Sequence, residues 1–178
     1  CYAMQDGRRY AFIADAAGPW NGIMMFEYSG WTGFDIGDEL EVTGEVDEYY
    51  DLTELTDCTV NVLSSGNTPY APTLLTTAAA NDEQYEGTYV RFENVSVLTA
   101  PDTNGEWTID DGSGVMIVND SYIYTYVANP GDTINWIQGP CNYSFGAYKL
   151  EVCGDSEMEV GTSGPTPTPA PTETPIPA

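Results

Sequence analysis

The sequence contains no histidine and very little positive charge. Its 178 residues include 4 Lys and Arg against 28 Asp and Glu, which gives a formal net charge of −24. Without histidine, Ser-His-Asp and Cys-His catalysis and His-ligated zinc or iron sites are excluded. With so few cations the chain has no basic surface for nucleic acid or for an anionic membrane. We therefore predict that it binds no nucleic acid.

Long apolar runs and nucleotide-binding motifs are also missing. No run of about 18 or more apolar residues is present, so no membrane span is predicted. No Walker or dinucleotide-binding glycine motif follows a strand pattern, and the GSG at 112–114 reads as a turn between two strands. A glycosidase uses a pair of carboxylates. In a chain with this many carboxylates some pair is always suitably spaced, so such a pair does not indicate that activity. We predict that the protein is not an enzyme and uses no cofactor.

What the chain does contain is a set of short segments that occurs twice. A self-match in fixed order and at a nearly constant offset is typical of duplication. The matching features of the first and second copies are YAFIAD (10–15) and EWTIDD (106–111), Gly37-Asp38 and Gly131-Asp132, Gly44 and Gly139, and Cys58 and Cys153.

Both copies are patterned as β-structure. The segments ELEVTGEV (39–46) and TINWIQG (133–139) are rich in β-branched and aromatic residues and are bounded by Gly, Asp and Asn. Helical periodicity is nearly confined to 74–85, which fits a short helix or a connector with one helical turn. Short strands at this spacing indicate small barrels or a sandwich.

Each copy presents a strand, an I-x-D strand, a short strand, a Gly-Asp turn and a long hairpin. With IGDELEVTGEVDEYYDLTEL (36–55) and EGTYVRFENVSVL (86–98), this order resembles the OB-fold barrels found in tandem in secreted and cell-surface proteins of bacteria and archaea. The resemblance implies an all-β protein with two tandem OB-like small β-barrels followed by an extended Pro/Thr-rich tail. The expected parts are a first barrel at 1–73, a connector at 74–85, a second barrel at 86–160 and a Thr-Pro stalk at 161–178.

One departure separates the two copies. Residues 86–98 open the second copy with a full strand, whereas the first copy starts only at CYAM and lacks most of its first strand. Either residues upstream of Cys1 supply that strand or another chain does, and the sequence leaves both open.

The last segment, GTSGPTPTPAPTETPIPA (161–178), alternates Thr and Pro. That pattern favours extended polyproline II and cannot build a core. It fits a linker or a Thr-glycosylated stalk, and it loosely resembles stretches in surface-layer and sheath proteins of methanogenic archaea. The candidate glycosylation residues, in this segment and in three N-x-S sequons, are Thr166, Thr168, Thr172, Thr174, Asn94, Asn119 and Asn142.

Four cysteines in a chain of exported type predict two disulfides. Cys141 and Cys153 flank a predicted hairpin symmetrically and are expected to face each other across its strands. The first copy has Val46 where the second has Cys141, so Cys58 is left to pair with Cys1. A bond between chains through Cys1 or Cys58 is the alternative.

Aromatic and acidic residues supply candidate contacts for ligands. The tyrosines Tyr122, Tyr124 and Tyr126 alternate along a predicted strand, which places them on one outward face with the intervening residues buried. Together with Tyr49 and Tyr50 they form a candidate contact face for a glycan or a partner. Ordinary half-buried sheet packing is the alternative.

Calcium is the metal that so much carboxylate could serve, since it takes oxygen ligands. The weak candidates are Asp110 and Asp111 in IDDGSG, and Asp47 and Asp51 around the first hairpin. Neither pair has EF-hand spacing, and Asp beside Gly is also ordinary turn chemistry.

These observations favour a non-catalytic structural module on the cell surface or outside the cell. We predict that it self-associates with other copies into a sheath, surface layer or filament. The alternative is an accessory ligand- or glycan-binding domain of a larger secreted enzyme.

Overall fold

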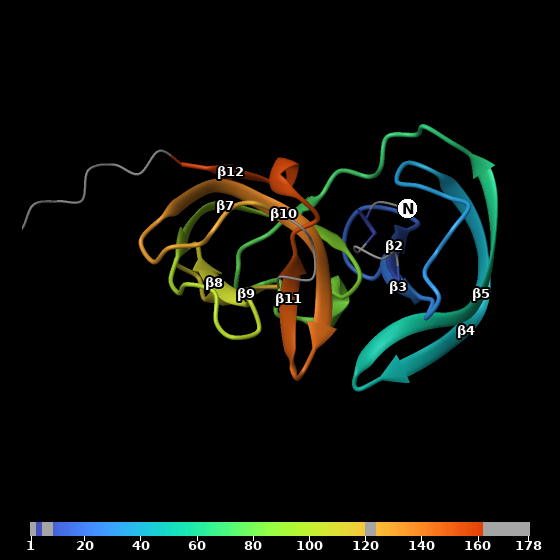
Figure 1. Ribbon diagram of the computed structural model, residues 1–178, viewed down its shortest axis with the longest axis horizontal. Helices are drawn as coiled ribbons and strands as arrows, with labels where there is room; N and C mark the ends of the chain where they lie inside the picture. The colour runs from blue at the N-terminus through green and yellow to red at the C-terminus, as the bar shows by residue number, and fades with distance from the viewer. Residues whose placement is uncertain (1–2, 5–8, 120–123, 162–178) are drawn as a thin grey trace, which may run out of the picture.

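The structure is a computed structural model that describes residues 3–4, 9–119 and 124–161 (Figure 1). Over these residues the protein is all-β, with two single-turn 3-10 helices, and none of its helices is long and apolar enough to cross a membrane. The elements are β1 (Ala3–Met4), β2 (Tyr10–Ala14), β3 (Gly22–Phe26), β4 (Glu39–Tyr49), β5 (Leu52–Ser64), β6 (Thr73–Leu74), η1 (Glu83–Tyr85), β7 (Tyr89–Val97), β8 (Trp107–Asp110), β9 (Val115–Asn119), β10 (Thr133–Ser144), β11 (Ala147–Glu151), η2 (Asp155–Glu157) and β12 (Met158–Val160). The Thr-Pro segment beyond residue 161 lies outside this description, as do Cys1 and Tyr122.

The second copy is a closed five-stranded barrel. Its strands follow one another in the order β7-β8-β9-β11-β10, and β10 pairs with β7 to close the ring. The pair β9–β11 is parallel, while the other neighbours within the ring are antiparallel. The short strands β6 and β12 extend the sheet beside β7 and β10.

The first copy repeats this order, but its described strands do not close into a ring. Its sheet runs β1-β2-β3-β5-β4, again with one parallel pair, β3–β5. The strand β1 has two residues and pairs with β2, and over the described residues the long strand β4 pairs with β5 alone. Figure 1 shows the two copies side by side, with β4 and β5 on the far side of the first copy and the tip of their hairpin bending back towards the β10–β11 hairpin. The prediction of an all-β protein built from small barrels is therefore confirmed: the second copy is a closed five-stranded barrel, and the described sheet of the first copy is open.

Strand register equates individual positions of the two copies. Val46 lies opposite Leu55 in the β4–β5 hairpin, and Cys141 lies opposite Leu150 in the β10–β11 hairpin. Since both leucines also belong to the parallel pair of their barrel, they occupy equivalent positions. The match between Val46 and Cys141 that the sequence indicated is thus reproduced in space.

A continuous apolar sequence in β2 and β3 serves two cores at once. Ala11 and Met25 face the interior of the first barrel, where they pack with Trp31 and Phe34. Phe12 and Met24 lie on the opposite face of these strands and pack against Leu52 and against the second barrel. Strands covered on both faces are expected to be apolar at every position, unlike the alternating β4.

The joint between the barrels combines this apolar cluster with backbone contact. Tyr89, Tyr143 and Cys153 of the second barrel pack against the cluster. Beside it, the backbone N–H of Trp20 donates to the carbonyl oxygen of Gln84 over 2.7 Å. The two barrels are therefore in direct contact rather than merely tethered.

The cysteines do not form the predicted bond. Cys58, Cys141 and Cys153 contain no disulfide among them, so the prediction of a Cys141–Cys153 bridge is wrong. Its error is one of register: the hairpin turns at Phe145 and Gly146, which places Leu150 and not Cys153 across from Cys141. The proposed partner of Cys58, at position 1, lies outside the described residues.

The tyrosines of 121–127 are also placed differently from the prediction. Residues 124–127 are not a strand, and Tyr124 and Tyr126 pack against the core of the second barrel, while Val127 is 66% exposed. The indole N–H of Trp107 donates to the Tyr124 hydroxyl over 2.9 Å, and the Tyr126 hydroxyl donates to Asp132 over 2.8 Å. Both tyrosines thus anchor a loop and are partly buried.

Candidate functional site

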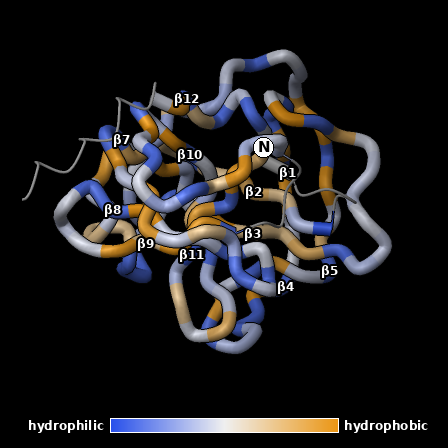
Figure 2. Tube along the Cα trace, turned by 60° about the vertical axis from the view of Figure 1, so that its left-hand side comes forward, coloured by the Kyte–Doolittle hydropathy of each residue, from blue (hydrophilic) through white to orange (hydrophobic). Residues whose placement is uncertain are grey.

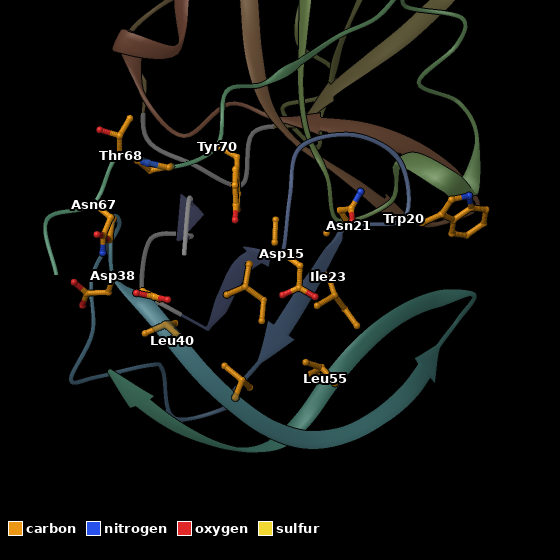
Figure 3. Close-up of a pocket in the computed structure, with 17 residues that line it drawn as sticks. Asp15, Trp20, Asn21, Ile23, Asp38, Leu40, Leu55, Asn67, Thr68 and Tyr70 are labelled. Carbon is orange, nitrogen blue, oxygen red and sulfur yellow. The ribbon is translucent and has the colours of Figure 1, made fainter. Parts of the chain in front are cut away.

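The open side of the first barrel contains a cavity of about 740 Å³. Its apolar wall comes from inward-facing residues of four strands: Ile13, Ile23, Leu40, Val42 and Leu55. Figure 3 shows Leu40 and Leu55 on the curved sheet, with Tyr70 extending towards them from the connector that follows β5.

The local sequence explains why this wall exists. In β4 the apolar residues Leu40 and Val42 alternate with Glu39, Glu41 and Thr43, so the apolar side chains face inward and the polar ones are exposed. A bulge between Thr43 and Glu45 then increases the curvature of the hairpin.

The same five positions are completely buried in the second barrel. Their counterparts Ile109, Met116, Ile134, Ile137 and Leu150 are each 0% exposed, whereas the five of the first barrel are half-buried. What covers the counterparts is the end of β7: Val95 and Val97 belong to their core cluster and pair with Ile134 and Ile109. Over the described residues, the strand in the place of β7 is the two-residue β1, and the cavity lies beside the positions that the end of β7 covers in the second barrel.

The repeated Gly-Asp turn marks the same difference. In the second barrel it holds the end of β7, because the N–H of Gly131 donates to the Val97 carbonyl and the Val97 N–H donates to the Asp132 carbonyl, each over 2.9 Å. In the first barrel the carbonyl of Gly37 accepts instead from the backbone N–H and side-chain amide of Asn67, at 2.8 and 3.0 Å. The Gly-Asp turn therefore holds a strand in the second barrel. In the first barrel it is hydrogen-bonded instead to Asn67, which lies in the segment between β5 and β6.

The rim of the cavity is polar and acidic. It is lined by Asp15, Asn21, Asp38, Glu39 and Asn67, and the indole of Trp20, 70% exposed, stands at its edge (Figure 3). Sequence reasoning noted Asp38 only as part of the repeated Gly-Asp turn and did not identify the apolar wall. The signal that could have located them was the missing first strand, since the residues left uncovered are those that a first strand touches.

A second depression, of about 590 Å³, lies between the tips of the β4–β5 and β10–β11 hairpins. It contains Asp51 and Glu48 of the first hairpin and Tyr143 and Tyr148 of the second. The predicted contact residues Tyr49 and Tyr50 lie at the first tip, 59% and 80% exposed, with ring centroids 4.8 Å apart. Of the described residues of the predicted contact face, Tyr49 and Tyr50 are exposed, whereas Tyr124 and Tyr126 are partly buried.

Of the four calcium candidates, Asp110 and Asp111 accept hydrogen bonds within a turn, whereas Asp47 and Asp51 lie on the β4–β5 hairpin. Asp110 accepts from the N–H groups of Gly112 and Gly114, and Asp111 accepts from Thr77 and Ser113. Within residues 3–4, 9–119 and 124–161, no group of three or more acidic or Cys side chains is arranged to hold a metal ion, and this covers Asp47 and Asp51 as well.

The sequons differ in how accessible their asparagines are. Asn94 is exposed at a left-handed position of β7, with φ of 54°. The side-chain amides of Asn119 and Asn142 both donate to Glu151, over 2.8 and 3.1 Å, so a glycan on either would displace a partly buried hydrogen bond. The candidate threonines lie outside the described residues.

Comparisons with protein-family models, with curated proteins and with solved structures found no match for this chain. Its function is therefore argued from the open barrel and the surfaces around it.

Proposed function

We propose that this protein is a non-catalytic extracellular structural module that joins to other copies by strand addition to its open barrel. In strand addition an extended segment pairs with an exposed sheet edge, and alternate side chains fill pockets beneath it. Repetition of that contact from copy to copy would build a filament, sheath or surface layer. The head-to-tail geometry of such a contact produces open arrays when it does not close into a ring.

The observation that carries this proposal is the contrast between equivalent positions in one chain. Val42 is half-buried beside the cavity, while its counterpart Ile137 is 0% exposed under β7. Burying apolar area contributes about 25 cal/mol per Å², so covering the five-residue wall would favour a strand in this place. An uncovered edge with an apolar face is the arrangement that natural proteins otherwise protect.

Charge limits which strand fits. The exposed side of β4 carries Glu39, Glu41 and Glu45, so two β4 edges facing each other would oppose like charges. The incoming strand is expected to be apolar on its inner face and neutral or basic outside. The strand β7 has this character, with Val95 and Val97 inside and Arg91 outside, where its guanidinium stacks over Trp136 at 4.2 Å.

The extracellular placement is supported by composition rather than by the fold. A net charge of −24 and the Thr-Pro segment suit a crowded or salty exterior. The cysteines do not add to this support, because Cys58, Cys141 and Cys153 are not bridged to one another.

The proposal is tested by the mass of the protein in solution as a function of concentration. We expect the wild type to associate and Val42→Lys to remain monomeric, because a charge facing the cavity of the first barrel opposes the entry of a strand. Thr43→Lys adds the same charge one residue further along, on the exposed face, and should still associate. Circular dichroism must show that both variants keep the β-structure of the wild type.

A peptide with the sequence of residues 88–98 provides a second test, because it mimics β7. It should bind the wild type, block association, and lose binding when its alternating apolar residues are shuffled. Electron microscopy of natively isolated protein should then show ordered filaments, tubes or sheets. If the protein binds the peptide but stays monomeric at every concentration, the cavity of the first barrel accepts a strand but self-assembly is refuted.

A further inference from the structure

The Thr-Pro segment that follows β12 has its prolines at alternate positions. From 165 to 172 every odd position is proline, and every even position is threonine or alanine. In an extended strand, alternate residues direct their N–H groups to opposite edges. All the N–H groups of this stretch would therefore lie along one edge, because proline has none. Such a strand can pair on one side only, which is why proline in sheets is confined to edge strands.

The open sheet of the first barrel offers one edge for pairing. Over the described residues β4 pairs with β5 alone, so its other edge has no strand beside it. On the opposite side of the opening, β2 already pairs with β1 at Ala11 and Phe12. A strand that enters the cavity therefore needs N–H groups towards β4 and not towards both of its neighbours.

Charge separates the Thr-Pro segment from the rest of the chain. Residues 162–178 contain Glu173 as their single acidic residue and no Lys or Arg, whereas 27 of the 28 acidic residues lie before them. The rim of the cavity carries Asp15, Asp38 and Glu39. A nearly neutral strand can approach this rim and the glutamates of β4 without the repulsion that an acidic strand of the same chain would meet.

Two exposed aromatic rings border the apolar wall of the cavity. Trp20 is 70% exposed and Tyr70 is 51% exposed, and both belong to the lining (Figure 3). Trp20 also has φ of 63°, a left-handed conformation that is uncommon for a bulky residue. Proline-rich segments are recognised by grooves lined with aromatic side chains. With Leu40 and Val42 behind them, the two rings complete a surface of that kind.

The segment begins at a place that favours a neighbouring copy over its own cavity. It follows Gly161, whose N–H donates to the carbonyl of Thr133 in the second barrel over 2.8 Å. In both views β12 lies on the side of the second barrel away from β4 and β5 (Figures 1 and 2). Extended at about 3.1 Å per residue, residues 162–178 would span roughly 50 Å, which is enough to reach an adjacent molecule.

We propose that the Thr-Pro segment of one copy fills the cavity of the next copy, with the N–H groups of 166–172 paired to β4 and the prolines turned towards the apolar wall. This inference rests on the proposed function and names the strand that it requires. The contact joins the end of one molecule to the first barrel of another. Repeated in one direction, it produces an open chain of copies.

Two full-length variants test which N–H groups the contact uses. Thr166→Pro/Thr168→Pro removes two N–H groups from the pairing edge, and Thr166→Ala/Thr168→Ala keeps both. We expect the first to weaken association about tenfold or more in sedimentation velocity, and the second to weaken it less than about threefold. Both variants retain the cavity, so both should bind the peptide of residues 88–98 as the wild type does. If the wild type associates and the two variants associate equally well, another segment supplies the strand and this inference alone is overturned.

A peptide of residues 162–172 probes the cavity directly. In NMR titration it should shift the methyl groups of Leu40 and Val42, and Trp20→Ala should weaken its binding at least about fivefold. Tyr28→Ala is the matched control, because Tyr28 is 73% exposed and lies outside the lining of the cavity, and it should change binding less than about twofold.

The two peptides distinguish failure of this inference from failure of the proposed function. If the 88–98 peptide binds and the 162–172 peptide does not, the cavity accepts a strand but the Thr-Pro segment is not that strand. If the wild type stays monomeric at every concentration while it binds the 162–172 peptide, self-assembly is refuted, and transfer of the segment between copies is refuted with it.

Discussion

Gly22 and Gly87 are in backbone contact where the two barrels meet. A Cβ added to Gly22 would lie 2.2 Å from the carbonyl oxygen of Gly87, and one added to Gly87 would lie 2.7 Å from the Cα of Ile23. No side chain fits between these segments. The joint is therefore set by main-chain approach, and the hydrogen bonds that flank it depend on that spacing.

We expect Gly22→Ala to disrupt this joint. The obstructing atoms belong to the backbone, so the barrels must separate to admit a methyl group, at a cost of about 2–3 kcal/mol in unfolding free energy. Hydrogen exchange at the Thr53 amide, which donates to Glu86 across the joint, should accelerate with it. Urea denaturation and exchange measured by NMR check both effects.

Gly33→Ala is the matched control for Gly22→Ala. Gly33 has φ of 89° in an exposed turn, and nothing lies within 4 Å of an added Cβ. Its replacement should cost about 1–2 kcal/mol through backbone strain alone and leave Thr53 protected. If both variants lose that protection equally, contact at the joint is not the cause.

The stability of the protein should fall as pH rises from 5 to 8. The pKa of Glu86 is about 7 in the folded chain against an ordinary value near 4.5, so between these values the folded state binds more protons than the unfolded state. The unfolding free energy then decreases with pH across that window. Because the sequence has no histidine, few other groups titrate there.

Glu86→Gln tests this pH dependence directly. The groups around the carboxylate are Glu48, Glu83, the Cys141 thiol and the Tyr148 hydroxyl, and none of them supplies a positive charge. The variant should flatten the slope of stability between pH 6 and 8, as measured by urea denaturation at each pH. An unchanged slope would assign the titration to another group, such as Glu54, whose pKa burial also raises.

The duplicated strand order was predictable from sequence, because alternation and turn residues are local features. Gly37-Asp38 and Gly131-Asp132 recur, and both glycines have the positive φ that such turns require. The match of Val46 to Cys141 was confirmed for the same reason, because each of these residues lies at the same distance from the turn of its hairpin.

What failed depends on register and on loops without regular pattern. The Cys141–Cys153 prediction assumed a hairpin centred on residue 147, whereas the turn lies at Phe145, whose φ of 52° no pattern in the sequence announces. A register error moves every cross-strand pair. Tyr124 and Tyr126 alternate as in a strand, but the Tyr124 hydroxyl accepts from Trp107 and the Tyr126 hydroxyl donates to Asp132, and both rings pack against the core.

The joint between the two barrels could not be predicted from sequence at all. Glu86 and Thr53 are 33 positions apart, and Tyr148 is further still along the chain. They meet only because two barrels dock, and docking rests on Gly22 and Gly87, which look like ordinary loop glycines in the sequence.

The three described thiols should differ in reactivity. Cys141 is completely buried, and burial, with the carboxylates of Glu86 and Glu151, raises its pKa. Iodoacetamide should therefore modify Cys141 of the native protein at least about a hundredfold more slowly than Cys58, because it must wait for unfolding. Peptide mass spectrometry without reductant should recover Cys141 and Cys153 as separate thiols. A bridged peptide would contradict this structure and restore the disulfide.

Thr77 holds the connector to the second barrel through Asp111. Its side chain is completely buried, and its hydroxyl lies 2.8 Å from Asp111 Oδ1 and 2.5 Å from the Gly114 carbonyl. Thr77→Val keeps the shape but removes the buried hydroxyl, which donates to Asp111 or Gly114 and accepts from the Asp111 N–H over 3.2 Å, so we expect a loss of about 1–3 kcal/mol in unfolding free energy. Thr59→Val, at an exposed position of β5, should change it by less than about 0.5 kcal/mol.

Calcium distinguishes this structural role of Asp111 from a metal site. If the carboxylate is used by Thr77 and Ser113, adding calcium or EDTA should leave the melting temperature of the wild type unchanged. Asp111→Asn should then destabilise the protein equally with and without the metal, since its cost comes from weakened hydrogen bonds to Thr77 and Ser113. A calcium-dependent rise in melting temperature that Asp111→Asn abolishes would show instead that the turn binds the ion and that its hydrogen bonds only preorganise the ligands.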